Sequence, residues 1–195
     1  MRKASSWLLG LLALASACGT EAAGPTPTKE TRKPMYFDIK AFLDAQTQEL
    51  TQRNPAVEKR VELRGGQMET TRVPEVDWSK ELQIFYQADI NKPALRGAYA
   101  VDSVAKGDTL RRTYSRKTGI DNAVERITVL SVVATPAVAQ EITATLTQDN
   151  PLFFSQKRVV MHTTDGRLSD YQVKGVQKLV LFDTLRYSAA GRVLK

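Results

Sequence analysis

The first periodic stretch of apolar residues lies between residues 37 and 53. Its repeating positions are spaced three and four residues apart and share one helix face: Ile39, Phe42, Leu43, Gln46 and Leu50. Asp38 stands in the expected first turn, where a carboxylate is favourable. Asn54-Pro55 follows, and proline disfavours helix in the residue before it. The pattern predicts a helix over residues 37–53.

A short hairpin is predicted next. Val57, Val61 and Leu63 alternate on one face of a strand, and residues 67–73 form the returning strand. Gly65-Gly66 between them suits a two-residue turn. The glycine pair lacks the further glycines and the lysine of a phosphate-binding loop, so we interpret it as a turn.

The most aromatic part of the chain predicts a second helix, between Asp77 at the N-cap and Pro93. Its broad apolar face consists of Trp78, Leu82, Phe85 and Tyr86. The simpler interpretation is that these rings pack on a sheet. The alternative is that the four side chains face a ligand or a partner.

The chain after this helix predicts strands only. The expected strands are rich in Val, Ile, Thr and aromatic residues: 97–104, 109–116, 123–134, 138–148, 152–164, 168–174 and 176–187. Their connections are too short for crossover helices, so neighbouring strands must be antiparallel. Residues 138–147 alternate apolar with polar, which indicates one covered and one wet sheet face. Gly175 is expected at a bulge or tight bend between the last two strands.

These elements predict an α+β fold with one domain over residues 35–195. Two N-terminal helices are expected to pack on a curved, twisted antiparallel β-meander. No internal repeat and no second linker divides this stretch.

The N-terminal end of the chain carries a different signal. Met1-Arg2-Lys3 is followed by eleven uncharged residues, 7–17, a length typical of a secretory signal peptide and too short for a membrane span. Small residues 15–17 precede Cys18, the only cysteine of the chain. This arrangement resembles the lipobox of bacterial lipoproteins. Ala15-Ser16-Ala17 also fits ordinary secretory cleavage, but that alternative leaves a free cysteine in an oxidising compartment.

The resemblance implies a cellular location and a membrane anchor. It implies that residues 1–17 are removed as a signal peptide and that Cys18 becomes an acylated N-terminus holding the protein in a membrane. Gly19 occupies a position where Asp retains enteric lipoproteins at the inner membrane, which favours the outer membrane, facing the periplasm. The aromatic segment vaguely resembles that of uncharacterised Gram-negative envelope lipoproteins, which carries no implied activity.

Residues 18–34 are expected to form the lipidated cysteine and a flexible tether. Residues 19–34 contain no large apolar side chain and are rich in Pro, Thr, Gly and charge. Removal of Arg2 and Lys3 with the signal peptide lowers the net charge from +7 to +5. This modest excess suits weak attraction to anionic lipid headgroups or lipopolysaccharide phosphates. The sequence lacks the mixture of basic and aromatic residues that is typical of nucleic-acid-binding surfaces, so we do not predict nucleic-acid binding.

Candidate chemistry is sparse. His162 is the only histidine and no G-x-S-x-G motif occurs, so no catalytic triad is predicted and we expect no enzymatic activity. One histidine and one cysteine are too few for a typical zinc site, and no calcium loop is present; no metal or other cofactor is predicted. Four acids gather around the second predicted helix: Glu75, Asp77, Glu81 and Asp89.

Three functions therefore remain open. The first is a non-enzymatic envelope lipoprotein that binds or assembles with an envelope partner. The second is a carrier or sensor of an apolar, lipid-like ligand beneath the helices, an architecture that resembles periplasmic lipoprotein carriers in outline only. The third is a glycan or lipid hydrolase using two of the clustered acids.

Overall fold

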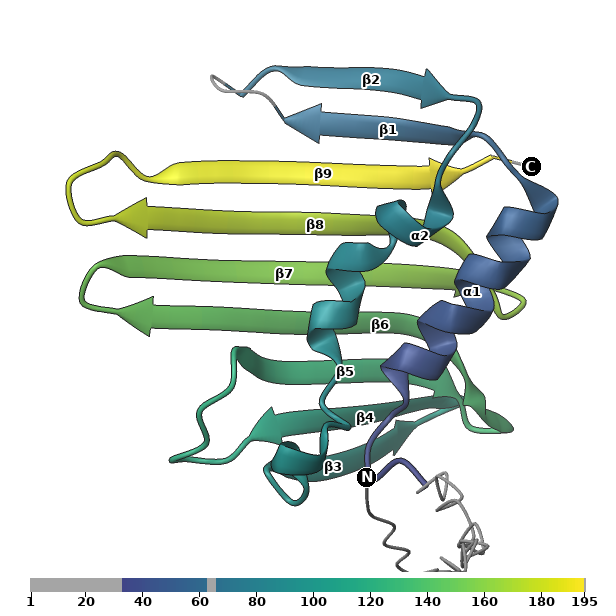
Figure 1. The fold of residues 1–195 in the computed structure, drawn as a ribbon. Helices are drawn as coiled ribbons and strands as arrows, with labels where there is room; N and C mark the ends of the chain where they lie inside the picture. The colour runs from purple at the N-terminus through teal and green to yellow at the C-terminus, as the bar shows by residue number, and fades with distance from the viewer. Residues whose placement is uncertain (1–32, 63–65, 195) are drawn as a thin grey trace, which may run out of the picture. The chain divides into compact units, whose positions relative to one another are not determined.

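A nine-stranded antiparallel sheet dominates the computed structural model, which describes residues 33–62 and 66–194. Figure 1 shows the strands in the order β2-β1-β9-β8-β7-β6-β5-β4-β3. The strands are β1 (Val57–Glu62), β2 (Met68–Val73), β3 (Tyr99–Lys106), β4 (Thr109–Arg116), β5 (Val124–Val132), β6 (Thr135–Asn150), β7 (Phe153–Thr164), β8 (Arg167–Leu179) and β9 (Leu185–Val193). Strands β3 to β9 are a meander in which each strand pairs with the next along the chain. The β1–β2 hairpin joins that meander through β9.

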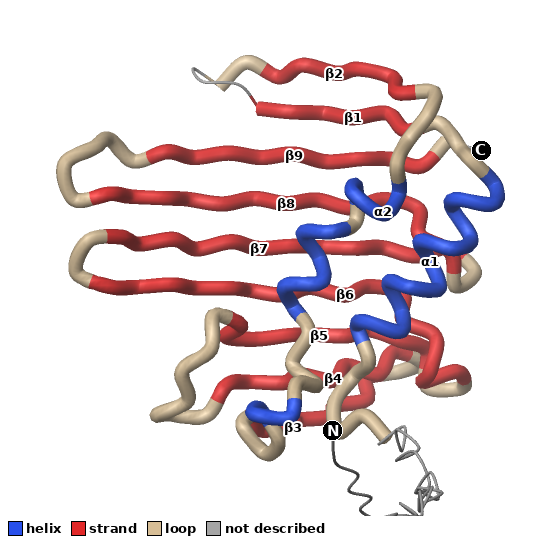
Figure 2. The backbone as a smooth tube through the Cα atoms, viewed as in Figure 1, coloured by secondary structure: helices blue, strands red, loops and turns tan. Residues whose placement is uncertain are grey.

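The helical segments cross one face of this sheet (Figure 2). They are α1 (Ile39–Arg53), α2 (Trp78–Glu81) and the 3₁₀ helices η1 (Gln83–Ala88) and η2 (Pro93–Leu95). The opposite face carries no helix among the described residues, and we call it the open face. None of the helices in residues 33–62 and 66–194 is long and apolar enough to cross a membrane.

The first helix has clear start and stop signals. The Asp38 carboxylate accepts a hydrogen bond from the Ala41 backbone N–H at 2.9 Å, as an N-cap does. Asn54 adopts the left-handed conformation at the C-terminal end, and its N–H bonds to the Leu50 carbonyl at 2.8 Å. The helix predicted over residues 37–53 is confirmed with a start two residues later.

Gln46 explains how α1 is fixed over the turn between β7 and β8. Its side-chain amide donates to the Gly166 carbonyl at 2.9 Å, and its carbonyl oxygen accepts from the Leu168 N–H at 2.7 Å. The Gly166 carbonyl and the Leu168 N–H thus both have a hydrogen-bond partner within the protein, and Gln46 is only 7% exposed. The helix face predicted from periodicity therefore holds one polar anchor among apolar residues.

The core lies between the helical layer and the sheet. Its largest fully buried side chains come from both layers: Trp78, Phe85, Ile39, Leu43, Leu50, Leu82, Ile90, Ile127, Ile142, Met161, Leu168 and Val57. In β6 the predicted alternation is confirmed from Glu141 onwards, because Ile142, Ala144 and Leu146 are buried while Thr143 and Thr145 lie on the open face. It was wrong before that point: Ala139 is buried while Val138 and Gln140 are exposed, because the pairing with β5 shifts register there. An antiparallel sheet covered on one side is therefore confirmed.

Two N-terminal helices are not confirmed. The second helical segment follows the β1–β2 hairpin, and only its first turn is α-helical. From Gln83 it continues as a 3₁₀ helix with three residues per turn. That winding places Leu82, Phe85 and Ala88 on one face, all 0% exposed, where an α-helix would rotate Ala88 away.

The last strand boundary was wrongly predicted. Gly175 lies inside β8 with regular pairing on both sides, and the chain turns after Leu179. A Cβ at Gly175 would overlap the Tyr187 ring, and one at Gly191 would overlap the Tyr171 ring. Each tyrosine ring thus covers a glycine directly across from it, so glycine here permits close approach rather than a bend.

Candidate functional site

The open face carries a group of cations that form no ion pair within the described residues. The strand register places Thr145 beside Arg158, Arg158 beside Lys174, and Lys174 beside Ser188. These side chains alternate with the buried residues Ala144, Val159 and Val173, so they project from the opposite side of the sheet. One transverse row of polar groups therefore crosses four strands.

This row lines an open groove with a volume of about 560 Å³. The groove spans β6, β7, β8, β9 and the end of β1. Its lining residues are Glu62, Thr145, Gln156, Arg158, Lys174, Gly175, Val176, Arg186, Tyr187 and Ser188. Three of them are cations and only Glu62 is a carboxylate, so the groove favours anions. We call it the basic groove.

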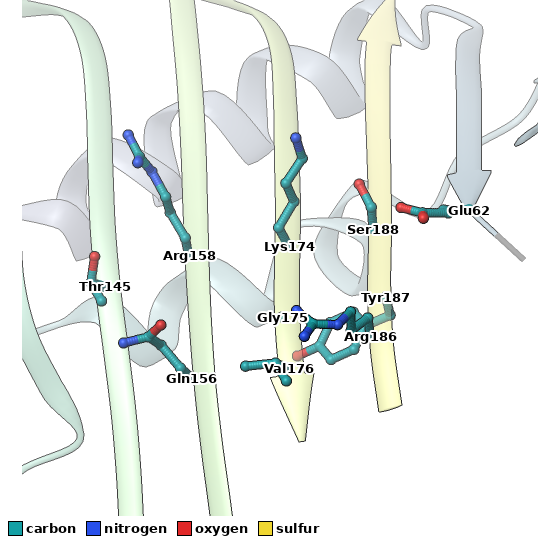
Figure 3. Close-up of a pocket in the computed structure, with 10 residues that line it drawn as sticks. All are labelled: Glu62, Thr145, Gln156, Arg158, Lys174, Gly175, Val176, Arg186, Tyr187 and Ser188. Atoms are coloured by element: carbon teal, nitrogen blue, oxygen red, sulfur yellow. The ribbon is translucent and has the colours of Figure 1, made fainter. Parts of the chain in front are cut away.

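Arg158 and Lys174 form a like-charged pair directly across two strands. Figure 3 shows both side chains extending from neighbouring strands in the same direction. Like charges at directly opposed positions destabilise an antiparallel sheet. Among the described residues, neither cation forms an ion pair, and the same holds for Arg186. An anion bound between Arg158 and Lys174 would remove this repulsion.

A second row on the open face alternates in charge. Across β9, β8, β7 and β6, the register aligns Arg192, Asp170, His162 and Glu141. The His162 Nδ1 lies 2.6 Å from the Asp170 carboxylate, and its Nε2 lies 3.6 Å from the Glu141 carboxylate. His162 therefore lies between acids from both neighbouring strands, and Arg192 lies opposite Asp170, whereas the opposed residues Arg158 and Lys174 of the basic groove are both cations.

No nucleophile completes a triad around His162 in the described part of the chain. The hydroxyl of Ser169 is hydrogen-bonded to this cluster, but its contacts are with the Asp170 carboxylate at 2.9 Å and with the His162 backbone carbonyl at 3.2 Å. It therefore contacts the acid and the backbone rather than the imidazole nitrogen that a base would use. The arrangement is suited to cross-linking strands.

The four aromatic-helix candidates lie on the other face of the sheet. Trp78, Leu82 and Phe85 are 0–1% exposed and belong to the core, and Phe85 packs edge-on against Tyr171 with ring centroids 5.8 Å apart. Tyr86 is half-buried, and its hydroxyl donates to Asp44 on α1 at 2.8 Å. Burial and this contact with Asp44 raise the pKa of Tyr86. The structure thus brings these four residues together as packing between helices and sheet.

Glu81 fastens the second helical segment to the sheet. One carboxylate oxygen lies 2.5 Å from Lys59 Nζ on β1, and the other accepts from the Tyr171 hydroxyl at 2.6 Å. Burial, followed by the hydrogen bond to Glu81, raises the pKa of Tyr171. Beside this clamp lies a largely apolar pocket of about 380 Å³, whose lining includes Ile84, Phe85 and Tyr187.

The remaining clustered acids occupy separate positions. Asp77 caps α2 through hydrogen bonds from Ser79 and the Lys80 N–H, and these bonds lower its pKa to about 2. Asp89 accepts from the Asn91 backbone N–H at 2.9 Å. The structure thus gives Asp77, Glu81 and Asp89 separate structural partners, and it does not bring Glu75 into contact with any of them.

The predictions for the N-terminal part of the chain fall outside the described residues. Cys18, the signal peptide 1–17 and nearly all of the tether 18–34 lie outside residues 33–62 and 66–194. Within those residues, no group of three or more His, Cys, Asp or Glu side chains could hold a metal ion.

Comparisons with known proteins give no family. No family model, no curated protein and no solved structure matches this chain. The geometry of the described residues is therefore the basis for a functional proposal.

Sequence analysis missed the basic groove because its residues come from five strands. Arg158 and Lys174 are sixteen positions apart and become neighbours only through the β7–β8 register. The sequence gives no clear signal for this face, because the paired stretches 154–160 and 172–178 do not alternate polar with apolar residues at a period of two. Only the pairing of the strands decides which charges meet.

Proposed function

We propose that this protein is a lipid-anchored, non-enzymatic binding protein of the cell envelope, and that its basic groove binds a ligand carrying phosphate groups. Acylated Cys18 would hold it at the outer membrane on the periplasmic side. The folded residues would present the open face to their ligand, either free or as part of a larger envelope partner.

The like-charged pair Arg158 and Lys174 is the observation that supports this function. Two cations at opposed positions repel each other and destabilise the sheet. A bound phosphate would neutralise this repulsion and accept a charge-assisted hydrogen bond from each of them. Thr145 and Ser188 flank the pair and add hydroxyl donors to the same row. The groove is also open and shallow, which suits a headgroup or saccharide better than an enclosed small molecule.

Two sources of phosphate fit this site. One is the headgroup of an anionic lipid, and the other is a soluble phosphorylated saccharide. Both supply a phosphate oxyanion to Arg158 and Lys174, so the chemistry of recognition is the same. Calorimetric titration with a diphosphorylated glucosamine disaccharide, and separately with phosphatidylglycerol vesicles, distinguishes them.

The decisive variant is Arg158→Gln/Lys174→Gln. Each charged hydrogen bond contributes about 1.5–3 kcal/mol, so we expect phosphate affinity to fall at least tenfold. The register extends the alternating row from Arg192 across Glu58 on β1 to Arg72 on β2. The matched control is therefore Arg72→Gln/Arg192→Gln, which removes the same charge from another part of the open face. Equal losses of affinity in both variants would reduce the effect to net charge and contradict a specific groove.

The anchor has its own test. Cys18→Ser should abolish lipid attachment and processing, as followed by mass spectrometry of the protein from membranes. An unmodified Cys18 in the mature wild-type protein would contradict the proposed anchoring while leaving the groove proposal intact.

A second candidate function is supported by the apolar pocket of about 380 Å³ beside Phe85 and Tyr171. A carrier of an apolar ligand would need a curved sheet that encloses such a pocket under the helices. The burial of Trp78, Leu82 and Phe85 favours packing at this position. Substitution of Phe85 separates the two hypotheses, as described in the Discussion.

A further inference from the structure

The largest concentration of exposed apolar side chains lies at two neighbouring hairpin turns. One turn connects β6 to β7 and the other connects β8 to β9, at the end of the sheet that the helices leave uncovered (Figure 1). Their exposed apolar residues are Leu152, Leu179, Val180, Leu181, Phe182 and Leu185. We call this set the apolar tips.

The apolar tips are more exposed than a folded protein ordinarily allows. Leu181 is 89% exposed, Leu152 is 71% exposed and Phe182 is 70% exposed. Single exposed apolar residues are common, but a contiguous group marks an interaction surface. The apolar tips are therefore a candidate interaction surface.

Backbone hydrogen bonds hold the two turns together and fix their shape. The Val180 N–H donates to the Leu152 carbonyl at 3.2 Å, which joins one turn to the other. The Asn150 side chain accepts from the N–H groups of Leu152 and Phe153, both at 3.0 Å. These bonds preorganise a projecting apolar surface, so little conformational entropy is lost when it is covered.

The charges beside the apolar tips identify the chemistry of the occupant. The strand ends leading into these turns, residues 148–158 and 174–186, carry five basic residues and two acids. Lys178 and Arg186 are exposed and closest along the chain to the apolar residues of the β8–β9 turn. Apolar side chains surrounded by cations match a bilayer with anionic headgroups, because the lysine and arginine stems reach the phosphates while the tips enter the hydrocarbon.

We propose that the apolar tips insert into an anionic lipid bilayer and form a membrane contact separate from any lipid on Cys18. A projecting surface fits a fluid bilayer, which opens around it, whereas a protein partner would need a matching pocket. The apolar tips do not line the basic groove, although three of the neighbouring cations, Arg158, Lys174 and Arg186, do. Insertion of the tips does not depend on which phosphate compound that groove binds.

A tryptophan reporter tests insertion in protein that begins at Gly19, so that neither the signal peptide nor the proposed lipid on Cys18 can bind the vesicles. Phe182→Trp places the reporter in the apolar tips, and the wild-type spectrum, from Trp78, is subtracted. With vesicles of equal parts phosphatidylglycerol and phosphatidylcholine, we expect a blue shift and quenching by lipids brominated in their acyl chains. The control reporter is Val133→Trp, an exposed residue in the turn at the opposite end of β6, which should show neither effect.

Loss of the apolar surface should weaken the contact. In protein that begins at Gly19 and so carries no lipid, Leu181→Ser/Phe182→Ser should reduce vesicle binding at least tenfold in co-flotation, since two large apolar side chains no longer leave water. Both residues are exposed, so circular dichroism should show unchanged folding. The control Val101→Ser/Val104→Ser alters two exposed residues of the edge strand β3 and should bind as the wild type does.

Three results would overturn the proposal. The first is an unshifted emission from the Phe182→Trp reporter in a protein that co-floats with vesicles. The second is equal insertion into vesicles of phosphatidylcholine alone, which would remove the role of the flanking cations. The third is equal vesicle binding by the two serine double variants, which would mean that another part of the chain makes the contact.

Discussion

Substitution of Phe85 by alanine distinguishes a packed core from a ligand cavity. Phe85 is 0% exposed, it packs edge-on against Tyr171, and it also borders the apolar pocket beside Glu81. In a packed core, truncation of a buried phenylalanine costs about 3–5 kcal/mol. Of this, the aromatic pair with Tyr171 contributes about 0.5–1.5 kcal/mol. We therefore expect Phe85→Ala to remove a large part of a typical stability of about 5–15 kcal/mol.

Urea unfolding followed by far-ultraviolet circular dichroism measures this loss. For a protein of this size, each kcal/mol corresponds to about 2–4 °C, so the melting temperature should fall by roughly 6–20 °C. The matched control is Gln83→Ala, an exposed position on the same 3₁₀ helix, which should stay within about 0.5 kcal/mol of the wild type.

A contrary result would favour the carrier. If Phe85 lined an empty ligand cavity, its ring would lack contacts on one side and its removal would cost less. A loss below about 1 kcal/mol, together with altered binding of an apolar dye relative to Gln83→Ala, would refute the packing argument. It would also make the pocket beside Phe85 the better candidate site.

Two further predictions concern stability. Gly191→Ala would place a Cβ within the space of the Tyr171 ring and displace that ring from Glu81, so unfolding should become easier by about 1–3 kcal/mol; an unchanged urea midpoint would show that the ring has room to move. The folded-state pKa of Asp77, lowered from 3.8 to about 2, means that its ionised form stabilises the fold above about pH 4 and that this stabilisation is lost as the pH falls towards 2. The urea midpoints of the wild type and Asp77→Asn should therefore converge as the pH falls from about 4 to 2. A constant difference between them would show that ionisation of Asp77 does not contribute to stability.

Local periodicity was sufficient to predict the elements that bury one face. The 3.6-residue pattern of α1 and the two-residue alternation of β6 each describe a single surface against water. Periodicity failed where the winding changed, because residues 78–88 include apolar positions at both four- and three-residue spacing. That mixture fits an α-helical turn followed by a 3₁₀ helix equally well.

Contacts between distant residues account for the other errors. Gly175 resembles a strand break in the sequence, and only the ring of Tyr187, twelve residues later, explains why glycine lies there. Residues 179–182 are apolar, and their composition therefore predicts strand. Apolar composition alone does not separate a buried strand from an exposed turn, so the apolar tips became visible only when exposure was known.

The position of β9 between β1 and β8 determines when the sheet can be completed. Every other strand pairing joins neighbours along the chain, but the β1–β9 pairing joins Val57 to Val193. During synthesis, the early hairpin must wait for the last strand, and closing so long a loop is slow relative to forming the meander. Until β9 arrives, β1 exposes an unpaired edge that other chains can join. A chaperone that protects the nascent chain would therefore be needed most at β1, far from the residues still being made.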